Sequence, residues 1–167
     1  MKKLVFLFIA ILGYTVTVNA QASATISNSA GATIVTPIAI AAGVGMNFGN
    51  LTTTTGGTVL LTPAGVRSVA TGAVTLPTPA GTVAAATFTV TGGLTSTYTI
   101  TLPGAASTLT DAGSHTMTVD TWTSNPSSTG TLTAGTQTLA VGGTLHLASG
   151  QAVGVYTGSF SVTVNYN

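Results

Sequence analysis

The sequence predicts an all-β fold, a β-sandwich, and three observations carry this prediction. Stretches in which apolar and polar residues alternate recur along the chain, as in strands with one buried face. Thr and Val, which favour strands, are abundant, and Gly or Pro separates the stretches. No segment after position 20 has the 3.6-residue period of an amphipathic helix.

Residues 1–20 have the pattern of a secretory signal peptide. Lys2 and Lys3 precede the apolar residues 4–12, and a small-residue cleavage pattern ends at Ala20. The apolar run is shorter than the about 20 residues that a membrane-spanning helix needs. We therefore expect cleavage near Ala20, export through the periplasm to the bacterial cell surface or beyond, and one domain in the exported chain, with no integral membrane segment.

Charged side chains are almost absent from the exported part of the chain. After cleavage one arginine and two aspartates remain, Arg67, Asp111 and Asp120, a net charge of −1 with His neutral. Ordinary domains carry roughly 25% charged residues, and low charge promotes association. The lack of clustered Lys and Arg argues against a nucleic-acid partner. The chain contains no Cys, so disulfides and thiolate metal sites are excluded.

Three strands are predicted in the first half of the domain. Pro37 places the first strand at an edge or a bend, because proline has no N–H for a ladder. Gly56 and Gly57 are expected to form a turn before the second strand. The three predicted ranges are residues 32–41, 58–62 and 67–75.

The second half of the domain is predicted to hold six further strands. The pair Gly142 and Gly143 lies between two alternating runs, which is typical of a two-residue hairpin turn. A run that starts at Tyr156 closes the chain. The predicted ranges are residues 86–91, 97–102, 115–122, 136–141, 144–147 and 156–166.

The alternation at the N-terminal end is too long for one strand. One apolar parity, interrupted by the polar residues Asn28 and Thr36, runs from residue 22 to residue 40. At roughly 3.3 Å per residue this stretch spans about 60 Å, about three typical strands. Either the stretch bends into two strands of the domain, or its first part leaves the domain, or that part is a disordered tail. We divide the chain into an N-terminal extension at residues 21–31 and a sandwich domain at residues 32–167.

Several short motifs occur in an order that resembles a known family. The chain then resembles the bacterial domain-of-unknown-function family numbered 4402, over roughly residues 32–167. That family is similar to spore-coat-U-like and archaic chaperone–usher pilin domains. The motifs are MNFGNL at 46–51, ATFTVTG at 86–92, YTITLP at 98–103, VGGTL at 141–145 and the run from residue 150 to residue 166.

The resemblance implies an immunoglobulin-like antiparallel sandwich that lacks its last strand. In such pilins the N-terminal extension of the next subunit fills the gap, so it implies a fimbria-like polymer of this chain or of related surface subunits. The expected donor residues share one parity of the extension: Ala22, Ala24, Ile26 and Ala30. The expected acceptor residues share one face of the closing strand: Tyr156, Phe160, Val162, Val164 and Tyr166.

The sequence predicts no catalytic, metal or cofactor site, and we expect no enzyme. The acidic side chains Asp111 and Asp120 are expected near turns or strand ends, and His115 and His146 at a rim or in solvent. No motif frames a nucleophile. Among the aromatic residues, Tyr98 and Tyr156 are expected in the core, while Trp122 is the best candidate for an exposed contact.

Two other functions stay open at this point. One is a monomeric secreted or surface adhesin, a cell-adhesion module that binds a host or matrix glycan or protein through its loops. The remote one is a small outer-membrane β-barrel, against which the aromatic residues are too few for two interface girdles. The N-terminal extension discriminates best, because only assembly by strand donation gives it a role.

Overall fold

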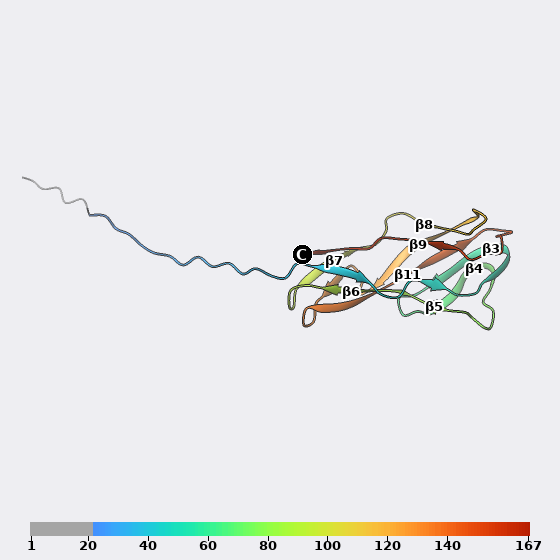
Figure 1. Cartoon of the computed structure of the whole chain (residues 1–167), viewed down its shortest axis with the longest axis horizontal. Coiled ribbons are helices and arrows are strands. Elements are labelled where there is room, and N and C mark those ends of the chain that lie inside the picture. The colour runs from blue at the N-terminus through green and yellow to red at the C-terminus, as the bar shows by residue number, and fades with distance from the viewer. Residues whose placement is uncertain (1–21) are drawn as a thin grey trace, which may run out of the picture. The chain divides into compact units, whose positions relative to one another are not determined.

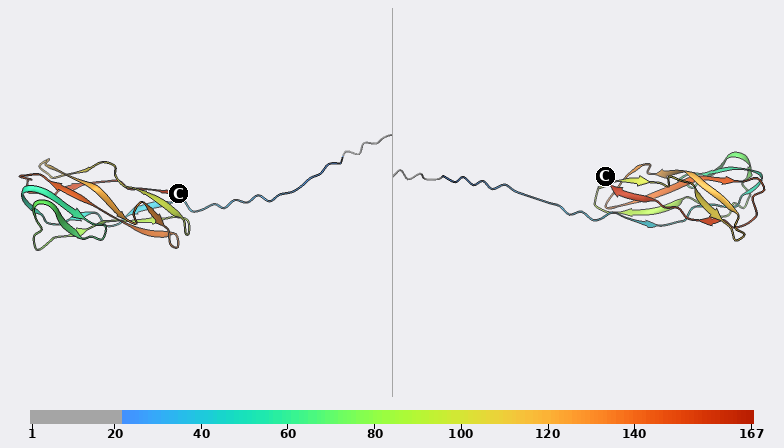
Figure 2. Two further views of the ribbon diagram at one scale, coloured as in Figure 1. Left: turned by 180° about the vertical axis from the view of Figure 1, so that it is seen from behind. Right: turned by 90° about the horizontal axis from the view of Figure 1, so that it is seen from above.

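The computed structural model describes residues 22–167, so the expected signal peptide lies outside the described residues. The described part holds thirteen strands and no helix. Figures 1 and 2 show these strands gathered after residue 38, with none drawn before β1. The strands are β1 (Ala39–Ala42), β2 (Asn47–Phe48), β3 (Thr52–Leu61), β4 (Arg67–Thr75), β5 (Val83–Ala84), β6 (Ala86–Thr91), β7 (Thr97–Thr101), β8 (Ser107–Thr110), β9 (Thr116–Asn125), β10 (Thr129–Thr131), β11 (Thr136–Leu147), β12 (Thr157–Gly158) and β13 (Thr163–Tyr166).

The strands form two main sheets, and every pair of neighbouring strands within a sheet is antiparallel. The larger sheet has the order β1-β6-β11-β9-β8-β12, with β3 paired to β11 and β4 paired to β3. The smaller sheet has the order β10-β7-β13, and β2 pairs with β5. The predicted all-β sandwich class is confirmed.

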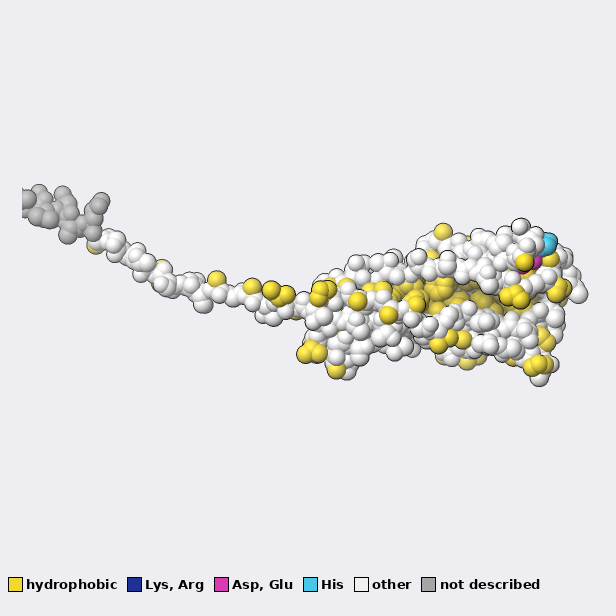
Figure 3. Space-filling view, viewed as in Figure 1, with side chains coloured by type: hydrophobic (Ala, Val, Ile, Leu, Met, Phe, Trp, Pro, Cys, Tyr) yellow, Lys and Arg dark blue, Asp and Glu magenta, His cyan; other side chains and the backbone are white. Residues whose placement is uncertain are grey.

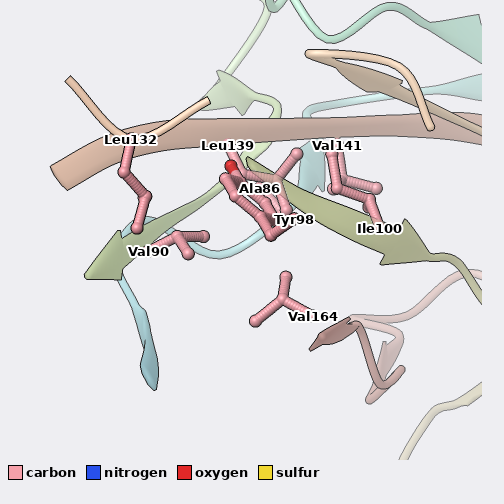
Figure 4. Packing of buried hydrophobic residues seen from close by; sticks show 8 residues of the cluster. All are labelled: Ala86, Val90, Tyr98, Ile100, Leu132, Leu139, Val141 and Val164. Atoms are coloured by element: carbon pink, nitrogen blue, oxygen red, sulfur yellow. The ribbon is translucent and has the colours of Figure 1, made fainter. Parts of the chain in front are cut away.

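Side chains from both sheets meet in the first of two core clusters (Figure 4). The larger sheet contributes Val90 of β6 and Leu139 of β11, while the smaller sheet contributes Ile100 of β7 and Val164 of β13. Tyr98 of β7 is completely buried among them, which confirms that it is a core residue. Period-two alternation turns these positions inward and their neighbours outward. The packing of one sheet on the other therefore depends on a small number of strands.

A second cluster lies where β3 crosses onto the larger sheet. Val59 and Leu61 of β3 pack there with Val119 of β9 and Leu145 of β11. Trp122 packs against both clusters and is half-buried, so it is less exposed than the sequence indicated. The indole ring thus joins the two clusters rather than forming a free surface contact.

The predicted hairpin at Gly142 and Gly143 is wrong, because both glycines lie inside the long strand β11. The first half of β11 pairs with β6 and its second half pairs with β3, and the register with β9 shifts between Gly142 and Thr144. A side chain at Gly142 would collide with the backbone of Leu61 and Thr62. These glycines therefore allow two neighbouring strands to approach β11 at the point where its partner changes.

The expected turn at Gly56 and Gly57 is also wrong, since both residues belong to β3. The register between β3 and β4 shifts between Thr53 and Gly57. A side chain on Gly72 of β4 would meet the backbone of both glycines. The glycine pair marks a bulge and a close approach between two strands, not a reversal of the chain.

The bounds predicted for the other strands agree with the structure in some cases and differ in others. The predicted ranges of β4 and β6 are confirmed at both ends. The first strand begins only at Ala39, after Pro37, instead of at residue 32. The predicted closing strand is two strands: β12 pairs with β8 in the larger sheet, and β13 pairs with β7 in the smaller sheet. The chain crosses between the sheets in residues 159–162, so it cannot pair continuously there.

Candidate functional site

An edge strand of the larger sheet, β1, lies beside an edge strand of the smaller sheet, β13, along one flank of the domain. In the described part of the chain, β1 is hydrogen-bonded to β6 alone and β13 to β7 alone. The Tyr166 hydroxyl of β13 donates to the Thr36 carbonyl, 2.6 Å away, just before β1. We call the strip between β1 and residues 160–166 the apolar seam. Edge strands carry backbone N–H and C=O groups that another strand can pair with.

Apolar side chains border this seam from both sides. Ile38 and Ile40 come from the segment of β1, and Phe160 and Val162 come from the segment before β13; all four are half-buried and pack on the core. Figure 3 shows apolar side chains gathered in a long hollow of the domain. In the same view, Figure 1 shows β1 along its lower side and the C-terminal segment above it. The flank therefore offers apolar surface between two unpaired strand edges.

Aromatic rings fill the middle of this region. Phe160 packs edge-on against Phe88 of β6, with ring centroids 6.1 Å apart. It also stacks on Trp122 of β9, with centroids 4.6 Å apart. All three rings are half-buried, so they keep apolar surface that a further strand could cover.

The expected acceptor residues are brought together with one exception. Val164 is buried, and Phe160, Val162 and Tyr166 are half-buried against the same core cluster. Tyr156 lies outside any strand, where its hydroxyl donates to the Ala152 carbonyl and accepts from Gln151. Its assignment to the acceptor face is wrong, because β12 pairs with β8, not with β7.

The N-terminal extension is described by itself. Residues 22–33 contain no strand, and every side chain in this segment is exposed. Ile26 is 94% exposed and is the one large apolar side chain among the expected donor residues, which also include Ala22, Ala24 and Ala30. The role of these residues as a donor strand stays a prediction.

The four acidic and histidine side chains form two separate pairs. Asp111 Oδ2 lies 2.9 Å from His115 Nδ1, and Asp120 Oδ1 lies 2.7 Å from His146 Nε2. Asp111 lies in a turn, as expected, whereas Asp120 lies inside β9, which corrects that expectation. Within residues 22–167, no group of three or more His, Cys, Asp or Glu side chains is arranged to hold a metal ion.

Arg67 is used for structure rather than for an anionic ligand. Its guanidinium donates to the carbonyl oxygens of Phe48, at 2.5 Å, and Asn50, at 2.8 Å. These bonds join the start of β4 to the loop between β2 and β3. No local pattern predicts this contact, because a backbone carbonyl accepts from any donor side chain that the fold brings within reach.

The carboxyl groups of Asp111 and Asp120 should make the stability of the fold depend on pH in the acidic range. The hydrogen bond from His115 holds the pKa of Asp111 below its ordinary 3.8, and hydrogen bonds from His146 and Thr121 do the same for Asp120. Unfolded carboxylates take up protons first, so stability is present above pH 3.8 and falls as the pH drops below it. We expect the urea midpoint to decline below about pH 4.

The control is a chain with both residues replaced, Asp111→Asn and Asp120→Asn. Because the chain has no other acidic side chains, the double variant should lose most of this acid dependence. An equal decline in both proteins between pH 5 and pH 2 would contradict the assignment.

Comparison with known proteins gives one clear result. The family model described as "Domain of unknown function (DUF4402)" matches residues 38–166. The chain belongs to this family. No curated protein and no solved structure matches the chain. The matched range begins beside β1 and ends at β13, so the family covers both edges of the apolar seam.

The confirmed family agrees with the resemblance noted in the motifs, while the likeness to pilin and spore-coat domains stays a prediction. Residues 22–37 precede the matched range and the first strand. No helix in residues 22–167 is both long enough and apolar enough to cross a membrane. The extension thus lies outside the range that the family model matches.

Proposed function

We propose that this member of the family is a secreted structural subunit of the bacterial surface that assembles by β-strand donation. The observation that carries the proposal is the apolar seam, which lies between the unpaired edges of β1 and β13. A donated strand would pair with these edges and cover the half-buried side chains between them. The proposal gives the chain a structural role and assigns it no catalysis.

The extension of a second copy has the properties that the seam requires. Its apolar parity holds Ala22, Ala24, Ile26 and Ala30, interrupted by Asn28, and its polar parity holds serine and threonine. A strand with this pattern presents one apolar face and one polar face. Small side chains suit a seam that already contains three aromatic rings, and Ile26 supplies one larger contact.

The scarcity of charge also supports assembly. Neither β1 nor β13 carries a charged side chain, and residues 22–33 carry none. Soluble proteins commonly protect sheet edges with lysine or inward-pointing charges. Because these edges lack that protection, pairing with another copy meets no electrostatic opposition.

Deleting residues 21–31 tests the proposal. We expect the purified variant to keep the far-ultraviolet circular dichroism of the parent, because the strands and core clusters lie after residue 38. Electron microscopy and light scattering should show filaments or larger species for the parent and monomers for the variant. Filaments formed by the deleted chain would overturn the proposal.

A monomeric adhesin is the second candidate, and one observation favours it. Val153 and Val155 are exposed on a loop without strand structure, with Gly154 between them. Exposed apolar side chains on a loop suit a contact with another molecule. A parent protein that stays monomeric at high concentration would favour this candidate over strand donation.

A further inference from the structure

Tyr166 links three segments that lie far apart in the sequence. Its hydroxyl accepts a hydrogen bond from the Gly93 N–H at 2.5 Å and donates one to the Thr36 carbonyl at 2.6 Å. Gly93 belongs to the loop between β6 and β7, and Thr36 precedes β1. The phenol therefore ties β13 to the chain that leads into β1.

The local sequence leaves space for this arrangement. A side chain at Gly92 would collide with the Tyr166 hydroxyl and with Leu132. A side chain at Gly93 would crowd Ser96 and come within ordinary contact of Val35. The two glycines thus let the phenol reach the loop backbone, and its two hydrogen bonds fix the direction of the ring.

These bonds bridge the two borders of the apolar seam at one of its ends. Beyond this end, the described structure has no hydrogen bond across the seam, between residues 38–48 on one side and residues 157–165 on the other. A strand that lies in the seam meets the bridge at the Tyr166 end. Its other end has no equivalent closure.

The sequence of a donated strand specifies its position only in part. A slip of one residue would turn the apolar face outward, but a slip of two residues keeps the parity. Such a slip exchanges the similar side chains of Ala22 and Ala24, so Ile26 and Asn28 are the residues of this parity whose place it changes in character. A fixed end to the seam adds a second determinant of position.

We infer that Tyr166 is the end stop of the apolar seam, a positioning residue that fixes the register at which a second copy's strand comes to rest. The inference rests on the proposed function. It assigns the hydroxyl, not the ring alone, a role in assembly. The Tyr166→Phe variant keeps the ring and removes both hydrogen bonds.

Disulfide trapping measures the register directly, because the chain has no native cysteine. Full-length mature chains carry Thr163→Cys, on the exposed face of β13, and one further cysteine on the polar face of the extension. Neighbouring strands bring paired side chains within disulfide range. Trapping between copies gives a ladder on a non-reducing gel, whereas a single cysteine gives dimers at most. The second cysteine is placed in turn at Ser23, Thr25, Ser27 or Ser29.

We expect one position to dominate the ladder in the parent. Because Tyr166→Phe removes the hydrogen bonds that close this end of the seam, it should reduce that preference by roughly tenfold and spread the ladder to positions two residues away. The matched control is Tyr156→Phe, which removes a phenol hydroxyl that bonds Ala152 and Gln151 instead. The control should keep the single dominant position.

The outcomes separate the two claims. A single position retained in Tyr166→Phe, or a spread that Tyr156→Phe reproduces, overturns the end stop and leaves strand donation standing. A parent that gives no ladder at any position overturns both claims. Should Tyr166→Phe fail to fold by circular dichroism, Gly92→Ala displaces the same hydroxyl, and an unchanged single position there overturns the end stop.

Discussion

Replacing Ile26 by aspartate is expected to abolish assembly of the mature protein without changing the fold of its domain. Ile26 is the largest side chain on the apolar parity of the extension, and it is 94% exposed in the single chain. Burying an isoleucine contributes about 1.5–3 kcal/mol, whereas an unpaired carboxylate in an apolar site costs several kcal/mol. Sedimentation and electron microscopy of the purified variant measure the loss.

The matched control is Ser27→Asp, which adds the same charge one position later. Residue 27 belongs to the polar parity, so its side chain would face solvent in a donated strand. We expect this variant to assemble like the parent, and Ile26→Leu to assemble nearly as well. If Ile26→Asp and Ser27→Asp assemble to the same extent, the apolar parity has no role in binding, and strand donation by these residues is wrong.

Local alternation predicted the bounds of two strands, β4 and β6. Turn-forming residues mark one end of each, with Pro63 and Gly65 before β4 and Gly92 and Gly93 after β6. The inward side chains of β7 and β13 were also predicted from alternation. Period-two patterns report which face is buried, and that information is local.

Paired glycines led to wrong predictions of turns. In β11 and in β3, paired glycines have the local signature of a turn, but the structure uses them inside strands. The reason at Gly142 is the backbone of Leu61 and Thr62, which lies about 80 positions earlier in the chain and leaves no room for a side chain. Contacts between strands far apart in sequence decide such cases, and no local pattern contains them.

The candidate site also has a part that local alternation predicts and a part that depends on contacts between remote segments. Alternation predicted that the five expected acceptor residues share a face, and four of them pack against one core cluster. Tyr156 lies apart from them, because the chain changes sheets between β12 and β13. The acceptor role itself stays a prediction. The bonds of Tyr166 to Gly93 and Thr36 had no sequence signal. A hydroxyl bonded to backbone atoms of two remote segments depends on the whole sandwich.

Replacing Tyr98 by alanine is expected to lower the free energy of unfolding by about 3–5 kcal/mol, since removing a buried aromatic side chain leaves a cavity. Tyr98 is completely buried in the cluster that joins the two sheets. Small domains are stable by about 5–15 kcal/mol, so this loss is a large part of the total. Urea denaturation followed by tryptophan fluorescence measures it, because Trp122 packs on the same cluster.

The Tyr98→Phe variant separates packing from hydrogen bonding at the same position. The Tyr98 hydroxyl donates to Gln137 Oε1 at 2.9 Å, and that oxygen also accepts the Thr131 N–H. Because Gln137 keeps a partner, losing the hydroxyl should cost only about 0.5–1.5 kcal/mol. A cost for Tyr98→Phe as large as that for Tyr98→Ala would mean that the hydrogen bond, not the packed ring, holds the two sheets together.

Alkaline pH gives an independent check on the same residue. Burial raises the pKa of Tyr98 above its ordinary 10.0, so the folded phenol stays neutral at a pH where the unfolded one ionises. Its contribution is complete below pH 10 and is lost as the pH rises towards the raised pKa. Between pH 9 and pH 12 the parent should therefore lose more stability than Tyr98→Phe, and parallel curves would mean that the Tyr98 ring is accessible to solvent in the folded protein.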